Sequence, residues 1–65
     1  MIRLAQEGGV WTAMIDRPEK ANSLTEEMLT ELALIAEAAH KEARVLILTG
    51  TGPVFSAGAD LDAAR

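Results

Sequence analysis

The chain has 65 residues, of which 49% are hydrophobic, and its ten acidic and six basic side chains give a net charge of −4. This length allows one small domain at most. The chain has no cysteine and one histidine, which excludes disulfides and a zinc site of the usual type, so no metal site is expected. The scattered basic residues predict no nucleic-acid partner, and no apolar run is long enough to predict a membrane partner.

The N-terminal residues lack the apolar core and cleavage site of a signal peptide, so a cytoplasmic location is expected by default. Two runs rich in strand-forming residues follow, at 2–6 and 10–16. Gly8-Gly9 between them predicts a hairpin. We expect Trp11, in the second run, to pack against the next helix. Arg17-Pro18 ends that run, because proline has no N–H for a strand.

A helix is predicted from Ser23 to about His40 or Lys41. Ser23 and Glu26 fit a capping box, in which the Ser23 hydroxyl accepts from the Glu26 N–H and the Glu26 carboxylate reaches back. The opposite face carries glutamates and is expected to be solvated. Apolar residues recur at spacings of three and four and predict one buried stripe: Leu24, Met28, Leu32, Ile35 and Ala39.

The continuous apolar run from Val45 to Leu48 predicts a strand covered on both faces, as in parallel sheets. The predicted order is therefore β-β-α-β, an α/β arrangement that ends in a loop rich in glycine. Asp60 is expected to cap a further helix. Nucleotide-binding motifs are excluded, because the third glycine of the dinucleotide motif would fall on Phe55 and no P-loop lysine follows.

Two motifs flank the predicted helix and strand. The first is Arg17-Pro18-Glu19-Lys20-Ala21-Asn22-Ser23-Leu24, and the second is Gly50-Thr51-Gly52-Pro53-Val54-Phe55-Ser56-Ala57-Gly58-Ala59-Asp60-Leu61. In this order they resemble the N-terminal end of the enoyl-CoA hydratase/isomerase (crotonase) family, over about residues 10–61. The resemblance implies the β-β-α-β N-terminal portion of a ClpP/crotonase-like spiral fold. Residues 1–65 would then be the N-terminal part of a single crotonase-like domain, truncated before the catalytic carboxylates.

The resemblance also implies a binding site for an acyl-CoA thioester. In the family, the main-chain N–H at the position of Ala59 is one of two donors to the thioester oxygen. Coenzyme A enters as part of the substrate, and no separate cofactor is implied. The residues that match the coenzyme A groove of the family are Lys20, Ala21, Ser23, Ala57, Gly58, Ala59, Asp60 and Leu61.

For the intact protein, the resemblance implies hydration of a 2-enoyl-CoA thioester or isomerisation of its double bond, in a homotrimer or hexamer. Other reactions of the family, such as hydrolysis, dehalogenation and decarboxylation, share this loop. The family's second oxyanion donor and its acid/base carboxylates have no counterpart in these residues, so we expect the 65 residues alone to be inactive. A non-catalytic fragment and a small module that binds CoA or an acyl thioester are the alternatives.

Overall fold

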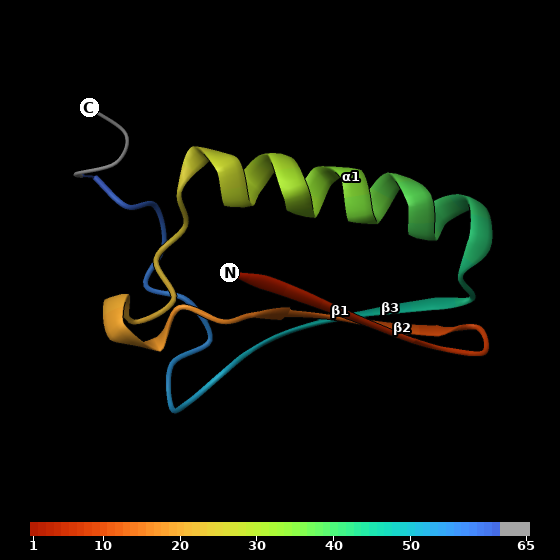
Figure 1. Cartoon of the computed structure of the whole chain (residues 1–65), viewed down its shortest axis with the longest axis horizontal. Helices are drawn as coiled ribbons and strands as arrows, with labels where there is room; N and C mark the ends of the chain where they lie inside the picture. The colour runs from red at the N-terminus through yellow and green to blue at the C-terminus, as the bar shows by residue number, and fades with distance from the viewer. Residues whose placement is uncertain (62–65) are drawn as a thin grey trace.

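Three strands form one sheet in the computed structural model, which describes residues 1–61, and one long helix lies across one face of the sheet (Figure 1). The sheet order is β1-β2-β3. No helix within residues 1–61 is long and apolar enough to cross a membrane. The elements are β1 (Ile2–Glu7), β2 (Val10–Ile15), the short 3-10 helix η1 (Pro18–Lys20), α1 (Glu26–Glu42) and β3 (Val45–Gly50).

The predicted hairpin and the predicted element order are both confirmed. β1 and β2 are antiparallel with Glu7 opposite Val10, so Gly8 and Gly9 make the two-residue turn. Gly8 has a φ of +60°, which glycine adopts without a steric penalty. β2 and β3 are parallel, and α1 is the crossover between them. Parallel strands require such a crossover.

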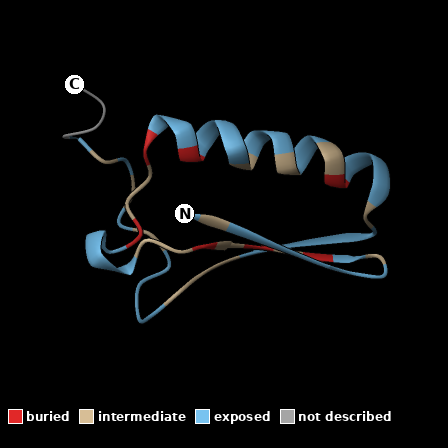
Figure 2. Cartoon of the chain, viewed as in Figure 1, coloured by how far each residue is buried: buried red, intermediate tan, exposed pale blue. Residues whose placement is uncertain are grey.

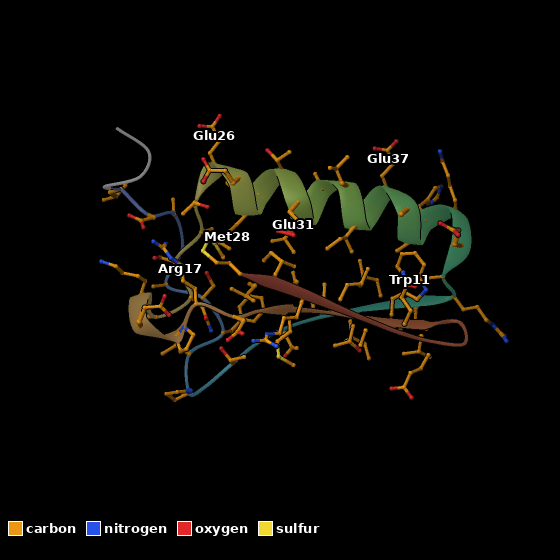
Figure 3. All side chains as sticks on the ribbon, in the orientation of Figure 1. Trp11, Arg17, Glu26, Met28, Glu31 and Glu37 are labelled. Carbon is orange, nitrogen blue, oxygen red and sulfur yellow. The ribbon has the colours of Figure 1, made fainter. Side chains whose placement is uncertain are left out.

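The core lies between α1 and the face of the sheet below it. Alternate residues of β2 (Trp11, Ala13 and Ile15) are buried, as expected when one face of a strand is covered. Met28 and Ala39 are buried on α1, and the buried positions of helix and sheet face each other (Figure 2). Trp11 lies beneath the helix (Figure 3), so its predicted place in the core is confirmed.

The helix begins later than predicted, and the expected capping box at Ser23 and Glu26 is wrong. The N-cap is Thr25, whose Oγ1 accepts from the Met28 N–H at 3.2 Å. Ser23 does not cap the helix, because the bridge between Leu24 and Ala59 delays the start of the helix to Glu26. The Ser23 hydroxyl instead accepts from Arg17 at 3.2 Å. The helix ends at Glu42, just beyond the predicted end.

The prediction that residues 45–48 are covered on both faces is wrong for the described residues. Side chains in β3 are 37% exposed at Leu46 and 49% exposed at Val45. β3 is an edge strand of the sheet. Leu46 lies on the same face as Trp11 and Val45 on the opposite face, so both faces of β3 are exposed. Continuous apolarity does correctly predict the parallel pairing of β3 with β2.

An ion pair ties the two ends of the sheet's hairpin together. The Arg3 guanidinium donates to Asp16 Oδ2, and the Thr51 hydroxyl donates to Asp16 Oδ1 at 3.3 Å. The hydrogen bond from Arg3 is the main reason that the pKa of Asp16 lies below its usual value of 3.8, and partial burial of the carboxyl opposes this effect. The ionised form of Asp16 is therefore preferred in the folded chain.

Replacing Asp16 with asparagine should lower stability in a pH-dependent way. Because the folded-state pKa lies below the unfolded value of 3.8, ionised Asp16 stabilises the fold above that pH. This contribution is lost as the pH falls through the folded-state pKa. Denaturant unfolding should give the unmodified chain a larger free energy of unfolding than the Asp16→Asn variant at neutral pH. The difference between them should disappear in acid. Glu19→Gln, which removes a charge from an exposed side chain, is the control. A difference that does not change with pH would contradict the role of the ion pair.

Candidate functional site

Two segments far apart in the sequence lie side by side at one end of the molecule. One is the turn that leads into α1, and the other is the loop that follows β3 (Figure 1). The Ala57 N–H donates to the Ala21 carbonyl at 3.0 Å. The Leu24 N–H donates to Gly58, and the Asp60 N–H donates to Leu24, at 2.8 and 2.9 Å. The structure thus brings together the two segments that the sequence predicts to form the site.

The buried side chain of Asn22 forms hydrogen bonds with both segments. Asn22 is fully buried, and its Oδ1 accepts from the Arg17 N–H at 2.8 Å. Its Nδ2 donates to the carbonyls of Thr51 and Val54 at 2.8 and 2.7 Å. Asn22 has a φ of +57°, a left-handed conformation that asparagine tolerates well. One amide therefore satisfies backbone groups on both segments.

The loop folds back closely over the end of β3 at Gly50. A Cβ atom on Gly50 would lie 2.3 Å from the Phe55 carbonyl oxygen and 2.9 Å from Asn22 Nδ2. These separations are too short for any side chain, so only glycine permits this approach. The Ser56 hydroxyl adds a further contact by donating to the Asn22 carbonyl at 2.8 Å.

The main-chain N–H of Ala59 points away from the turn. The Gly58 carbonyl and the Ala59 N–H belong to one planar trans peptide group, so they point in opposite directions. Since the Gly58 carbonyl accepts from Leu24, the Ala59 N–H is directed to the other side. Ala59 is exposed, and its N–H donates to no acceptor within residues 1–61. The structure thus presents a backbone donor in a fixed direction.

Arg17 forms hydrogen bonds with both segments of the site (Figure 3). Its Nη1 donates to the Ser23 carbonyl at 3.1 Å and to an Asp60 carboxylate oxygen at 2.7 Å. The Arg17 and Asp60 side chains are each only 14% exposed. The helix predicted after Asp60 lies outside the described residues.

Comparison with known proteins identifies the family. The family model described as enoyl-CoA hydratase/isomerase matches residues 5–65. The chain belongs to the enoyl-CoA hydratase/isomerase family. The probable enoyl-CoA hydratase echA6 of Mycobacterium bovis is 42% identical over 62 residues, which are 94% of this chain and 26% of that protein. The 1,2-epoxyphenylacetyl-CoA isomerase of Escherichia coli is 41% identical over 58 residues, which are 86% of this chain and 22% of that protein.

Comparison with a solved structure supports the same family. The chain resembles a Thermobifida fusca protein assigned as an enoyl-CoA hydratase, whose crystal structure contains acetoacetyl-CoA. The TM-score is 0.88 at 38% identity, over 98% of this chain and 25% of that one. The predicted family and the predicted crotonase-type β-β-α-β fold are therefore confirmed. The chain spans about a quarter of the length of the relatives that it matches.

The residues predicted from the family resemblance lie on both sides of the paired segments. Lys20 is exposed at the end of η1, and the Ser23 hydroxyl accepts from Arg17. Their roles in binding stay predictions. The predicted residues that are exposed are Lys20, Ala21, Ala57, Ala59 and Leu61, whereas Ser23, Gly58 and Asp60 are half-buried.

The bonds that hold the site together were not predicted from the sequence. Arg17 was predicted to end a strand, and both Arg17 and Asn22 were named only as members of the first motif. An asparagine in a turn rich in small and polar residues is a signal for bonds from a side chain to the backbone, but it does not identify the acceptors. Those acceptors lie about 30 residues further along the chain.

A hollow of about 380 Å³ between α1 and β1 includes Trp11 and Leu34 in its lining, but none of the predicted site residues. Residues 1–61 hold no group of three or more side chains that could bind a metal ion. The α1 glutamates, including Glu26 and Glu37, are exposed (Figure 3).

Replacing Asn22 with aspartate should strongly destabilise the fold, because the ionised side chain cannot donate to Thr51 and Val54. The expected loss is roughly 2 to 6 kcal/mol, or about 1 to 3 for each carbonyl left without a donor. Burial beside two carbonyls should raise the pKa of the introduced carboxyl above its unfolded value. The loss should therefore be largest at neutral pH and smaller in acid.

The measurement is denaturant unfolding at both pH values, with Ser56→Ala as the control. That control removes the hydroxyl bond to the Asn22 carbonyl and the bond that Ser56 Oγ accepts from the Gly58 N–H, and it should cost roughly 1 to 3 kcal/mol, equally at either pH. Equal stability of the Asn22→Asp variant and the unmodified chain would show that the buried amide does not hold the two segments.

Proposed function

We propose that this chain forms the acyl-CoA-binding portion of an enzyme that hydrates 2-enoyl-CoA thioesters. The observation that carries this proposal is the outward direction of the Ala59 N–H, beside a turn and loop that are bonded to each other. Membership of the enoyl-CoA hydratase/isomerase family supports it. The acetoacetyl-CoA in the Thermobifida fusca structure supports a ligand of the same class.

The proposed role of the Ala59 N–H is to stabilise negative charge on the thioester oxygen. When water adds to an α,β-unsaturated thioester, the carbonyl oxygen develops enolate character. A donor that is already held in place stabilises this charge more than it stabilises the neutral ground state, and it needs no reorganisation. The Leu24 bond to Gly58 fixes the donor's direction before any substrate arrives.

The small residues around Ala59 suit close contact with a ligand. Ala57 and Gly58 precede it. A methyl group and a hydrogen atom are too small to block the approach of a ligand to the main chain. Gly58 has a φ of +97°, which lets the loop turn at that point. We propose that coenzyme A lies along residues 57–61, with Lys20, Ala21 and Ser23 on the other side of the groove and no separate cofactor.

Isomerisation of an acyl-CoA thioester is the second candidate. It is favoured by the 41% identity to the 1,2-epoxyphenylacetyl-CoA isomerase of Escherichia coli. Both reactions place charge on the thioester oxygen, so both would use the Ala59 N–H in the same way. They differ in their acid and base groups, and the carboxylates within residues 1–61 are exposed glutamates and the paired Asp16 and Asp60.

Replacing Ala59 with proline in the intact enzyme should lower kcat by roughly 10²- to 10³-fold, because the substitution removes the N–H. Ala59→Ser is the matched control, since it keeps the donor and should retain most activity. Steady-state kinetics with crotonyl-CoA give the comparison. An equally severe loss in both variants would mean that side-chain volume at this position matters and the backbone donor does not.

The 65 residues alone should not hydrate crotonyl-CoA. The reaction needs a base, an acid and paired oxyanion donors, and residues 1–61 offer one oriented donor. The assay follows loss of the conjugated thioester absorbance with the purified chain. Turnover above a buffer blank that persists after Glu26→Gln and Glu27→Gln would contradict the claim that these residues lack the groups needed for hydration. Turnover that those changes abolish would assign the chemistry to the α1 glutamates.

A further inference from the structure

A continuous path of hydrogen bonds joins the Arg17 guanidinium to the Ala59 N–H. Arg17 Nη1 donates to the Ser23 carbonyl at 3.1 Å. That carbonyl shares a peptide group with the Leu24 N–H, which donates to the Gly58 carbonyl at 2.8 Å. The Gly58 carbonyl in turn shares a peptide group with the Ala59 N–H. The exposed donor therefore belongs to the second of two hydrogen-bonded peptide groups, the first of which accepts from a cation.

Such a path strengthens the donor at its end. A peptide group whose carbonyl accepts a hydrogen bond is more polarised, so its N–H becomes a better donor, and this effect accumulates along a chain of bonds. The first bond of this path comes from a charged group, which makes it stronger than a bond between neutral groups. The Arg17 side chain is only 14% exposed, so water screens its charge little.

Asp60 opposes this effect, because its carboxylate accepts from the same Nη1 at 2.7 Å. Its negative charge offsets the cation, and it belongs to the residue next to Ala59. Arg17 in turn offsets the negative charge of Asp60 close to the place where an oxyanion would form. The two side chains thus have opposite influences on the Ala59 N–H, although they form one ion pair.

We propose that Arg17 is a positioning residue that strengthens the Ala59 N–H as a donor to the thioester oxygen, through the peptide groups of Leu24 and Ala59. The inference rests on the proposed function, since it assigns Arg17 to the same oxyanion site. Arg17 touches no reacting atom in this scheme. It orients and polarises the donor and balances the Asp60 charge.

The test compares three variants of the intact protein that contains this chain. Arg17→Met removes the cation and keeps much of the side-chain length. Asp60→Asn removes the anion and keeps an oxygen that can accept from Arg17. Lys41→Met is the matched control, because it removes an exposed cation in the last turn of α1, at the opposite end of the helix from the site.

The first readout is the carbonyl stretching frequency of bound butyryl-CoA labelled with ¹³C at the thioester carbon. Donation by Ala59 should lower this frequency in the unmodified protein. Arg17→Met should reduce the lowering and decrease kcat about tenfold with little change in KM, because a donor is weakened and not lost. Asp60→Asn should keep the lowering at least as large, and Lys41→Met should leave it unchanged.

A purely structural ion pair would behave differently. Removing either partner of such a pair would have the same effect, so Arg17→Met and Asp60→Asn would shift the carbonyl frequency in the same direction. That result would overturn the proposal. An unchanged frequency in a folded Arg17→Met protein would also overturn it. If Arg17→Met does not fold, Asp60→Asn decides alone, since a reduced lowering in that variant contradicts the proposed path.

A second readout needs no ligand and separates this proposal from the proposed function. The amide nitrogen resonance of Ala59 responds to polarisation of the Gly58 carbonyl. In the ligand-free protein, Arg17→Met should move this resonance and Lys41→Met should not. Failure of the unmodified protein to bind butyryl-CoA would reject the proposed function, while this resonance would still support or overturn the path from Arg17.

Discussion

The hydrogen bond from the Leu24 N–H to the Gly58 carbonyl, 2.8 Å long, is the contact on which the site depends. Because a peptide group is planar and trans, fixing the Gly58 carbonyl also fixes the direction of the Ala59 N–H. The same bond delays the start of α1, since Leu24 is held in an extended bridge with Ala59. One backbone contact therefore sets both the donor and the beginning of the helix.

This contact exists because buried side chains hold the two segments together. Asn22 binds the loop after β3 through two carbonyls, and Gly50 leaves room for that loop to pass close by. Arg17 closes the arrangement by binding Ser23 and Asp60. Buried polar groups of this kind are costly when a partner is missing. The complete set of bonds therefore favours one arrangement of the loop over others.

Local patterns predicted most of the fold. Gly8-Gly9 marked the hairpin, and spacings of three and four marked the buried side of α1, because both signals depend only on neighbouring residues. The predictions failed where distant residues compete. Ser23 looked like a helix cap, but the bridge between Leu24 and Ala59 delays the helix, and the Ser23 hydroxyl accepts from Arg17 instead. Continuous apolarity in β3 indicated a parallel strand and could not show that β3 lies at the edge of the sheet with both faces exposed.

The candidate site was predicted from family resemblance and not from local pattern. The resemblance singled out residues on both segments, and the structure brings the two segments together. It did not reveal the bonds that join them, because these bonds connect residues as far as 43 positions apart, as between Arg17 and Asp60. Sequence separation of this size leaves no periodic signal. Only the folded chain shows which turn meets which loop.

Amide hydrogen exchange, measured for single residues by NMR, tests the central claim most directly. The N–H groups of Leu24, Ala57 and Asp60 donate to carbonyls across the two segments, so their exchange should be slowed. The Ala59 N–H lies among them but points away, and it should exchange much faster than all three. Equal protection of Ala59 and its neighbours would contradict an outward donor. Fast exchange at all four positions would contradict the pairing of the two segments.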